Sequence, residues 1–202
     1  MTRIPVALIR HAPTPWNEAR RLQGRTDVPL SERGREAAGR WTLPADYRAF
    51  EWVASPLIRA RQTAALLGLS PPAEPAIVEM DWGDWEGFTG VELREKYGEE
   101  FDNRAAQGID LRPHGGESPR DVRARVAEWM ARIAAAGRPT GAVTHQGVIR
   151  AALSLATGWN MVRKPPFDMN WESVHLFYVR ADGTVEIARL NISLLPDEGT
   201  DE

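Results

Sequence analysis

Residues 4–11 read IPVALIRH, an apolar run that ends in two nitrogen-rich side chains. The run Ile4–Ile9 predicts a buried β-strand, and Arg10 and His11 follow it with no room for a turn. We therefore expect both side chains at the carboxyl edge of a sheet, where open α/β sheets bind ligands. A guanidinium has a planar fork of donors that suits phosphate, and imidazole acts as a nucleophile or a proton carrier near neutral pH. The pair indicates chemistry on a phosphoryl group, although an isolated Arg-His pair is more often a structural pair held by a carboxylate.

The composition excludes several classes of protein. The 202 residues are compatible with one domain, and a net charge of −3 argues against a nucleic-acid-binding surface. No apolar run is long enough to cross a bilayer, so we expect a cytoplasmic protein that contacts neither nucleic acid nor membrane. The absence of cysteine excludes disulfides, thiolate zinc sites and cysteine nucleophiles. Because 23 of the 25 basic residues are arginine, a phosphate site has to be built from Arg and His. Nothing in the sequence sets the oligomeric state.

Predicted strands and helices alternate along the chain. Ser31 caps a helix that runs to about Leu43, and Ser55-Pro56 caps a second helix through Leu67. Ser118-Pro119, with Asp121 three residues past the cap, starts a third helix. Residues 51–55, 76–78 and 142–144 are strand candidates, residues 147–157 form a helix, and residues 174–179 and 184–190 flank a hairpin turn.

This order predicts an α/β fold with three layers, α/β/α, a mostly parallel central sheet and a C-terminal hairpin on the sheet. No composition shift marks a second domain, so we expect a single domain over residues 1–195. Residues 90–116 form a helical insertion over the carboxyl edge, as a lid or a pocket wall. Residues 196–202 are an acidic tail that we expect to be disordered.

Four candidate groups each follow a predicted strand. Arg10 and His11 follow the first, and Arg59 lies in the first turn of the helix after residues 51–55. Glu79 follows residues 76–78, and His145 ends the strand 142–144. If the strands are mainly parallel, all of these groups meet at one edge, where helix N-termini also favour anions. Phosphomonoester hydrolysis is among the slowest uncatalysed reactions, so several cations must converge on the phosphoryl oxygens. Arg10, Arg59 and a protonated His145 provide them without a metal.

Seven short motifs follow one another over about residues 4–191. They are LIRHAPT (8–14), Asn17, QGRTDVPL (23–30), SPLIRARQTA (55–64), EMDWGDWEG (79–87), GGES (115–118) and THQGVIR (144–150). In this order they resemble the histidine phosphatase superfamily, the phosphoglycerate-mutase-like group. Within it, the length and the DWGDWEGFT motif resemble the small phosphatases that include α-ribazole phosphatase.

The resemblance implies a role for each matching position. His11 is the nucleophile and forms a phosphohistidine, while Glu79 protonates the leaving alcohol and then accepts a proton from water. Arg10, Arg59 and His145 line the phosphate pocket, and Asn17 adds a neutral donor. His11 acts as the neutral ring and His145 is more useful charged, so we expect their pKa values to be pushed apart. The family implies a small phosphate ester as substrate, with no cofactor and no metal.

The chain departs from the family pattern at three places. Ala12 stands where most members have glycine, and Gln146 replaces a common glycine, reshaping the wall that contacts phosphate and substrate. The mutase branch carries a lysine where this chain has residues 88–90, FTG. We therefore predict a metal-independent phosphomonoester hydrolase. The alternatives are a cofactor-dependent phosphoglycerate mutase and a catalytically silent phosphate-binding relative. Glu117 is a second candidate for the proton donor.

Overall fold

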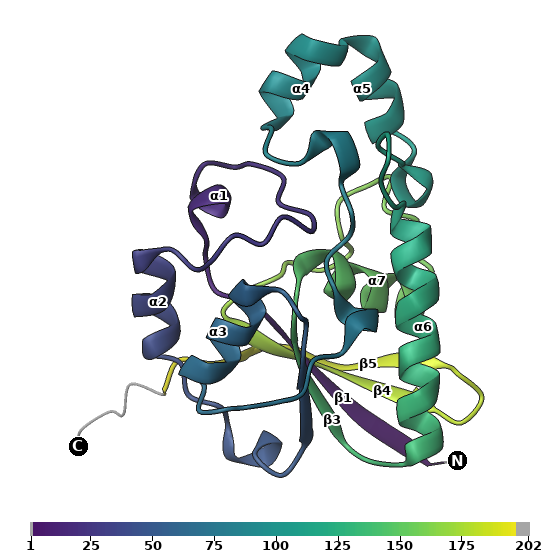
Figure 1. Ribbon diagram of the computed structural model, residues 1–202. Helices are drawn as coiled ribbons and strands as arrows, with labels where there is room; N and C mark the ends of the chain where they lie inside the picture. The colour runs from purple at the N-terminus through teal and green to yellow at the C-terminus, as the bar shows by residue number, and fades with distance from the viewer. Residues whose placement is uncertain (1, 197–202) are drawn as a thin grey trace.

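The computed structural model describes residues 2–196, so most of the predicted tail, residues 197–202, lies outside the described residues. Five strands form one sheet, with helices on both of its faces (Figure 1). The strands are β1 (Arg3–Arg10), β2 (Glu51–Ala54), β3 (Thr140–Thr144), β4 (Ser173–Arg180) and β5 (Val185–Ser193). The α-helices are α1 (Pro15–Glu18), α2 (Glu32–Gly39), α3 (Ile58–Leu66), α4 (Gly90–Tyr97), α5 (Glu99–Ala105), α6 (Pro119–Ala136) and α7 (Gln146–Thr157). Short 3-10 helices span Ala45–Tyr47, Pro75–Ile77, Gly83–Trp85 and Gly108–Asp110.

The alternating side chains of β1 enter two separate cores, which gives the three layers. Leu8 and its same-face neighbours pack with α6 and α7. Ala7 and Ile9 point the other way and pack with α2 and α3. Because successive side chains of a strand face opposite sides, one fully buried strand organises both cores. The expected burial of the first strand and the three-layer arrangement are both present.

The prediction of a mostly parallel sheet is wrong, because the sheet is mixed. Its order is β2-β3-β1-β4-β5. The strands β1, β2 and β3 are parallel, whereas β4 runs antiparallel to β1 and β5 antiparallel to β4. The loop 158–172 brings the chain to the carboxyl end of β1, where Val174 pairs with Ile9, so β4 has to run back. The C-terminal hairpin itself is present as expected.

The segment predicted as a strand over residues 76–78 is a 3-10 helix, Pro75–Ile77. The segment that precedes this turn pairs with β2 through an isolated bridge between Ala54 and Ala73. The Glu74 N–H still donates to Ala54 O, but the next N–H that would face β2, that of Ala76, donates to the Glu74 carboxylate at 2.9 Å, so the ladder ends there. Glu79 therefore follows a turn rather than a strand.

Two predicted helix boundaries are also wrong. The second helix starts at Ile58, with Leu57 rather than Ser55 at the cap position; the Ser55 hydroxyl makes its short contact with His145 Nε2, at 2.6 Å, and accepts the Leu57 N–H only at 3.4 Å. The first helix ends at Gly39 instead of near Leu43. By contrast, the capping box of Ser118 and Asp121 at the start of α6 is present as predicted.

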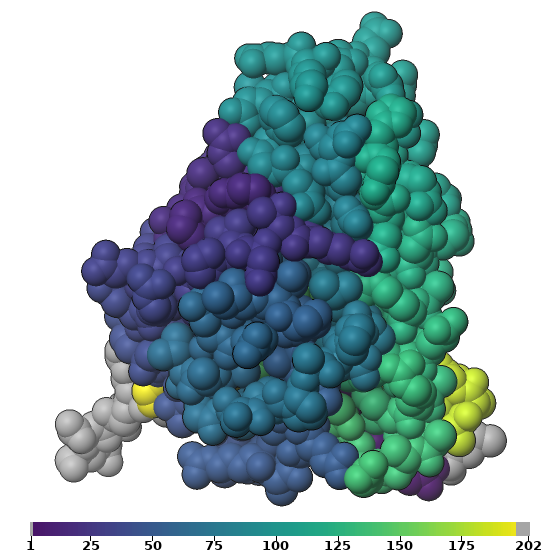
Figure 2. All heavy atoms as spheres, viewed as in Figure 1, coloured from purple at the N-terminus to yellow at the C-terminus, as the bar shows by residue number. Residues whose placement is uncertain are grey.

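The insertion over residues 90–116 contains α4 and α5, as expected. Figure 2 shows it at the top of the molecule, with the segment that follows β1 directly beneath it. A bidentate pair between Arg21 and Glu92 joins these two parts, with N···O distances of 2.8 and 3.1 Å. No helix within residues 2–196 combines the length and apolarity needed to cross a membrane.

Candidate active site

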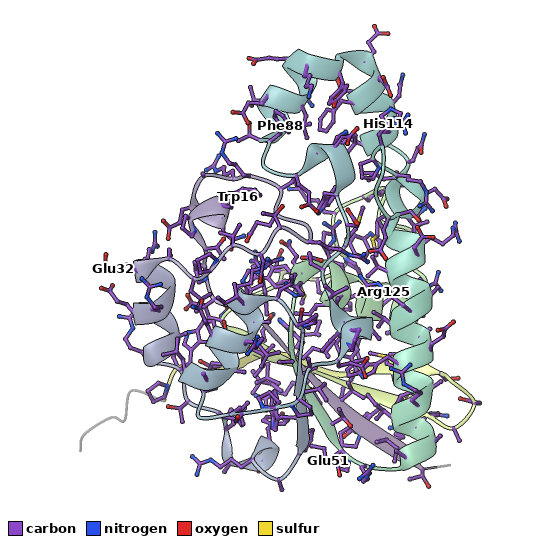
Figure 3. The ribbon with its side chains drawn as sticks, in the orientation of Figure 1. Trp16, Glu32, Glu51, Phe88, His114 and Arg125 are labelled. Atoms are coloured by element: carbon purple, nitrogen blue, oxygen red, sulfur yellow. The ribbon has the colours of Figure 1, made fainter. Side chains whose placement is uncertain are left out.

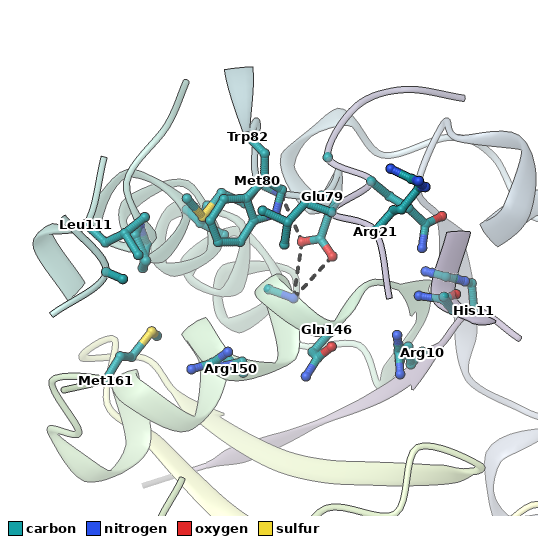
Figure 4. A pocket seen from close by; sticks show the side chains of 18 of the residues that line it. Arg10, His11, Arg21, Glu79, Met80, Trp82, Leu111, Gln146, Arg150 and Met161 are labelled. Carbon is teal, nitrogen blue, oxygen red and sulfur yellow. Dashed lines mark hydrogen bonds between the residues drawn. The ribbon is translucent and has the colours of Figure 1, made fainter. Parts of the chain in front are cut away.

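A cavity of about 330 Å³ lies at the carboxyl end of β1, beneath the insertion (Figure 4). Six of the seven site residues predicted from the sequence line it. They are Arg10, His11, Asn17, Arg59, Glu79 and Gln146. The seventh, His145, is fully buried and is not part of the lining within residues 2–196.

His145 nevertheless lies beside His11, because neighbouring strands end side by side. The His11 N–H donates to Thr144 O at 2.9 Å, and the Ser55 N–H donates to Val143 O at 2.9 Å. The side chains that follow β2, β3 and β1 therefore form a row of Ser55, His145 and His11. The two imidazole centroids are 5.2 Å apart, with an interplanar angle of 59°.

The His11 ring has a defined tautomer. Its Nδ1 lies 2.7 Å from Ala12 O, and a carbonyl oxygen only accepts, so Nδ1 carries the proton. The lone pair of the neutral ring is then on Nε2. The Ala12 N–H donates to Thr63 Oγ1 at 3.0 Å, which fixes the carbonyl that orients the ring. Ala12 is not among the residues with positive φ within 2–196, so this position does not demand glycine.

His145 is held from behind by Ser55. Its Nε2 lies 2.6 Å from Ser55 Oγ, and both side chains are fully buried. Its Nδ1 has no partner within residues 2–196. The sequence analysis missed this role because a serine before proline is also a typical helix cap. The position of Ser55 one residue after a strand was the signal that would have indicated it.

The pKa values of both histidines lie well below the usual value. Burial is the largest cause for each ring, because it disfavours the charged form. Arg10 and Arg59 lower the pKa of His11 further, and the same two guanidinium groups, together with His11, act on His145. Both shifts therefore run toward the neutral ring, whereas the sequence analysis expected a neutral His11 beside a charged His145.

Arg59 is a fully buried cation that is fixed by backbone carbonyls. Its guanidinium donates to Gly24 O at 2.7 Å and to Thr26 O at 2.9 Å. The loop that supplies these oxygens is tied to the Glu86 carboxylate, which accepts the Thr26 N–H at 2.9 Å. A Cβ at Gly24, whose φ is +54°, would lie 1.7 Å from Glu86, so glycine is required there. The loop and the cation therefore position each other.

Arg10 and Asn17 are held in different ways. The Arg10 guanidinium lies 5.2 Å from the centroid of the Trp171 ring, and its buried Nε has no partner within residues 2–196. The Asn17 amide oxygen accepts the Thr14 N–H at 3.1 Å in a capping box. That bond leaves the NH₂ group of Asn17 for the cavity.

Glu79 lies against the first turn of α7. Its Oε1 accepts the Met80 N–H at 2.9 Å and the Gly147 N–H at 3.1 Å, and Figure 4 shows both bonds. The competing candidate Glu117 is not among the lining residues within 2–196. It pairs instead with Arg25 at 2.9 Å and Arg125 at 3.3 Å. Figure 3 labels Arg125 on α6, below the insertion. The geometry thus favours Glu79 as the carboxylate that meets a substrate.

The structure adds cavity residues that the sequence analysis did not assign. Arg150 lines the cavity four residues after Gln146, on the same face of α7, a spacing that was a readable signal. The other additions are mostly apolar and include Met80, Leu111, Val122 and Met161. Within residues 2–196, no group of three or more His, Cys, Asp or Glu side chains is placed to hold a metal ion.

Comparisons with known proteins show the family of the chain. The family model of the histidine phosphatase superfamily (branch 1) matches residues 6–193. A 2,3-bisphosphoglycerate-dependent phosphoglycerate mutase from Methylobacterium radiotolerans is 32% identical over 195 residues, which is 89% of this chain and 92% of the relative.

Among solved structures, a mycobacterial glucosyl-3-phosphoglycerate phosphatase complexed with VO3 is 26% identical. Its TM-score is 0.77, with 95% of this chain and all of that chain covered. A candidate α-ribazole-5′-P phosphatase from Escherichia coli has a TM-score of 0.82 at 23% identity, with 98% of this chain and all of that chain covered. The latter likeness concerns the fold alone.

Proposed function

The chain belongs to the histidine phosphatase superfamily, and on that premise we propose that it hydrolyses small phosphate monoesters through a phosphohistidine at His11. The observation that carries the proposal is the orientation of the His11 ring. Its Nδ1–H is committed to Ala12 O at 2.7 Å, which leaves the Nε2 lone pair at a cavity that Arg10 and Arg59 also line. A neutral imidazole beside two guanidinium groups is suited to attack a phosphoryl dianion.

The first half-reaction forms the phosphoenzyme. His11 Nε2 attacks phosphorus while the bond from phosphorus to the ester oxygen breaks. Glu79 gives its proton to that oxygen, so that the leaving group departs as an alcohol. Arg10 and Arg59 stabilise the charge on the phosphoryl oxygens, and the Asn17 amide donates a further hydrogen bond.

The second half-reaction returns the enzyme. A water molecule attacks phosphorus, Glu79 takes the water proton, and the bond between nitrogen and phosphorus breaks. Inorganic phosphate leaves, and His11 is again neutral. Gln146, at the start of α7, contacts the phosphate or the substrate at the cavity wall.

His145 serves this cycle from its buried position beside His11. Its pKa is lowered by burial and by the surrounding cations. A phosphoryl dianion close by raises that pKa, because an opposite charge favours the protonated ring. His145 then gains its charge when substrate binds and adds to the cations that stabilise the transition state.

The mutase alternative is favoured by the relatives that carry that name. A mutase has to retain a bisphosphorylated intermediate, which calls for more cations around the site. In this cavity the side chains beyond Glu79 are mostly apolar, with Arg150 as a cation on that side. Hydrolysis is therefore the better match. Isomerisation of 3-phosphoglycerate that depends on 2,3-bisphosphoglycerate would instead establish the mutase.

A panel of phosphate esters tests the proposal, comparing the wild type with His11→Ala in the presence and absence of EDTA. We expect turnover in the wild type with or without EDTA, and none in the variant. Denaturing the wild type during turnover of a ³²P-labelled ester should trap label on His11. Equal rates for wild type and variant, or loss of activity with EDTA, would overturn the mechanism. A fully inactive wild type that still binds inorganic phosphate would identify a silent relative.

A further inference from the structure

The cavity has a second end that the phosphoryl chemistry does not use. Figure 4 shows His11 and Arg10 on one side of Glu79, and Arg150, Leu111 and Met161 on the other. All of these residues line the same cavity. A phosphoryl group at His11 therefore places its leaving group beyond Glu79, toward Arg150.

Arg150 is fixed in place while its donors stay uncommitted. Its guanidinium lies 5.1 Å from the centroid of the Trp159 ring, and its buried Nε has no partner within residues 2–196. Trp159 is itself anchored, since its carbonyl accepts the Ser154 hydroxyl at 2.7 Å and its indole N–H donates to Arg163 O at 3.0 Å. Stacking covers one face of the guanidinium and leaves its edge available for a ligand.

Of the other guanidinium groups at the cavity, Arg10 lies beside His11 at the phosphoryl end, and the remaining two already have partners. Arg21 is paired with Glu92, and Arg59 donates to two backbone carbonyls. None of the ion pairs within residues 2–196 includes Arg150. Burial lowers its pKa, with Glu79 acting in the opposite direction, so the guanidinium is partly desolvated. A partly desolvated cation that forms no ion pair with a protein carboxylate favours an anionic ligand.

The cavity wall around Arg150 is apolar, and a backbone hydrogen bond joins the two segments that form it. Leu111 belongs to the insertion and Met161 to the loop after α7, and the Ile109 N–H donates to Asn160 O at 2.7 Å to join these segments. Met161 has a φ of +63°, a conformation rare for residues other than glycine. Strained residues of this kind concentrate at ligand sites, where surrounding contacts hold them.

We propose that the leaving group of the substrate has an apolar body against Leu111 and Met161 and a carboxylate that binds Arg150. This inference rests on the proposed hydrolase function and names the substrate class. A single guanidinium matches the single charge and planar fork of a carboxylate, whereas a second phosphate would bring two charges to one cation. Gln146, at the phosphate end, and Arg150 are one helical turn apart, with about 5–6 Å between their Cβ atoms. A compact leaving group is therefore long enough to reach from the phosphate end to Arg150.

The test uses two esters of matched shape, 4-carboxyphenyl phosphate and its neutral analogue 4-carbamoylphenyl phosphate. For the wild type, we expect kcat/KM to be about ten- to a hundredfold higher for the carboxylate, the range for hydrogen bonds to a charged group. The ratio should fall to about one in Arg150→Met, which keeps the apolar stem over Trp159. It should recover in part in Arg150→Lys, which restores charge without the fork.

The control variant is Arg138→Met. Arg138 pairs with Glu51 at 2.8 Å, and Figure 3 labels Glu51 at the end of the molecule opposite the insertion. Its substrate ratio should equal that of the wild type.

Each remaining outcome decides between explanations. Equal kcat/KM for the two esters in the wild type would mean that Arg150 only balances Glu79, and the inference fails while the hydrolase stands. A preference for benzene-1,4-diyl bisphosphate over the carboxylate would also overturn it. If the wild type hydrolyses other phosphate esters but none of these, the inference fails while the hydrolase stands; if it hydrolyses no phosphate ester at all, the proposed function itself fails. The wild-type ratio is independent of whether the Arg150 variants fold.

Discussion

Replacing Glu79 by glutamine separates proton transfer from every other role of this side chain. The glutamine oxygen can take the place of Oε1 and keep the hydrogen bonds from the Met80 and Gly147 N–H groups, at 2.9 and 3.1 Å in the parent. The amide nitrogen then occupies the position of Oε2, whose contact with the Gly147 N–H is the longer one, at 3.4 Å, and which is therefore the oxygen better placed for proton transfer. Glu79→Gln should therefore fold and bind phosphate as the wild type does, while it cannot protonate a leaving group.

The size of the effect depends on the leaving group. A positioned general acid contributes about 10²- to 10⁴-fold, or about 3–5 kcal/mol of barrier, when the leaving group needs a proton. Benzyl phosphate leaves as an alkoxide unless it is protonated, so its kcat/KM should fall by that factor. 4-Nitrophenyl phosphate has a similar ring but leaves as a stable phenolate, so its kcat/KM should stay within a few fold.

Steady-state kcat/KM for the two esters, measured in parallel, decides the matter. Glu117→Gln is the matched control, because Glu117 was the competing candidate and pairs with Arg25 and Arg125 instead of lining the cavity. It should leave the ratio between the two esters unchanged. Equal losses on both esters in Glu79→Gln, or a changed ratio in Glu117→Gln, would refute the assignment of the acid.

Three further variants test the surroundings of the site. Ser55→Ala removes the hydroxyl that lies 2.6 Å from the His145 ring. Because an unpaired buried polar group costs about 1–3 kcal/mol, both the free energy of unfolding and the affinity for phosphate should fall. Unchanged inhibition by vanadate would contradict this expectation. His175 is fully buried, and burial lowers its pKa to about 4. In the unfolded chain the same imidazole has a pKa of about 6.5, so between pH 6.5 and pH 4 the unfolded chain binds a proton that the folded chain does not. The free energy of unfolding should therefore fall by about 3 kcal/mol as the pH drops over that range. His175→Asn should flatten that part of the urea-unfolding profile, and an unaltered slope would exclude the residue. Gly34→Ala puts a Cβ 1.9 Å from a backbone carbonyl oxygen and should cost about 1–3 kcal/mol, whereas Gly39→Ala on the same helix meets nothing within 4 Å and should leave thermal stability equal or higher.

The sequence predicted the parts of the fold that local pattern determines. The burial of β1, the capping box of α6 and the C-terminal hairpin each follow from a short run of residues. The direction of β4 depends instead on where the loop 158–172 delivers the chain, and no local pattern encodes that path. The strand prediction for residues 76–78 was wrong because a short apolar run near prolines fits a strand and a 3-10 turn equally well.

The sequence predicted the site residues best where they directly follow a strand, and less well elsewhere. Arg10, His11 and Arg59 reach the cavity as expected, and Glu79 reaches it although the strand before it is absent. The Thr144 hydroxyl, which donates to Ile77 O at 2.7 Å, holds that segment beside the end of β3 instead. Such a contact between residues 67 positions apart has no signature in the sequence.

The first two turns of α7 explain how one cavity serves both the reaction and the recognition of its leaving group. The Gly147 N–H binds the Glu79 carboxylate, and a Cβ at Gly147 would lie 2.3 Å from Glu79 Oε1, so only glycine lets the acid approach this closely. Gln146 precedes that contact and Arg150 lies one turn beyond it. The acid is thus held between the two anionic ends of the proposed substrate, at the level of the ester oxygen that it has to protonate. A leaving group bound at Arg150 brings that oxygen to Glu79, so recognition of the carboxylate and proton transfer are coupled through a single helix.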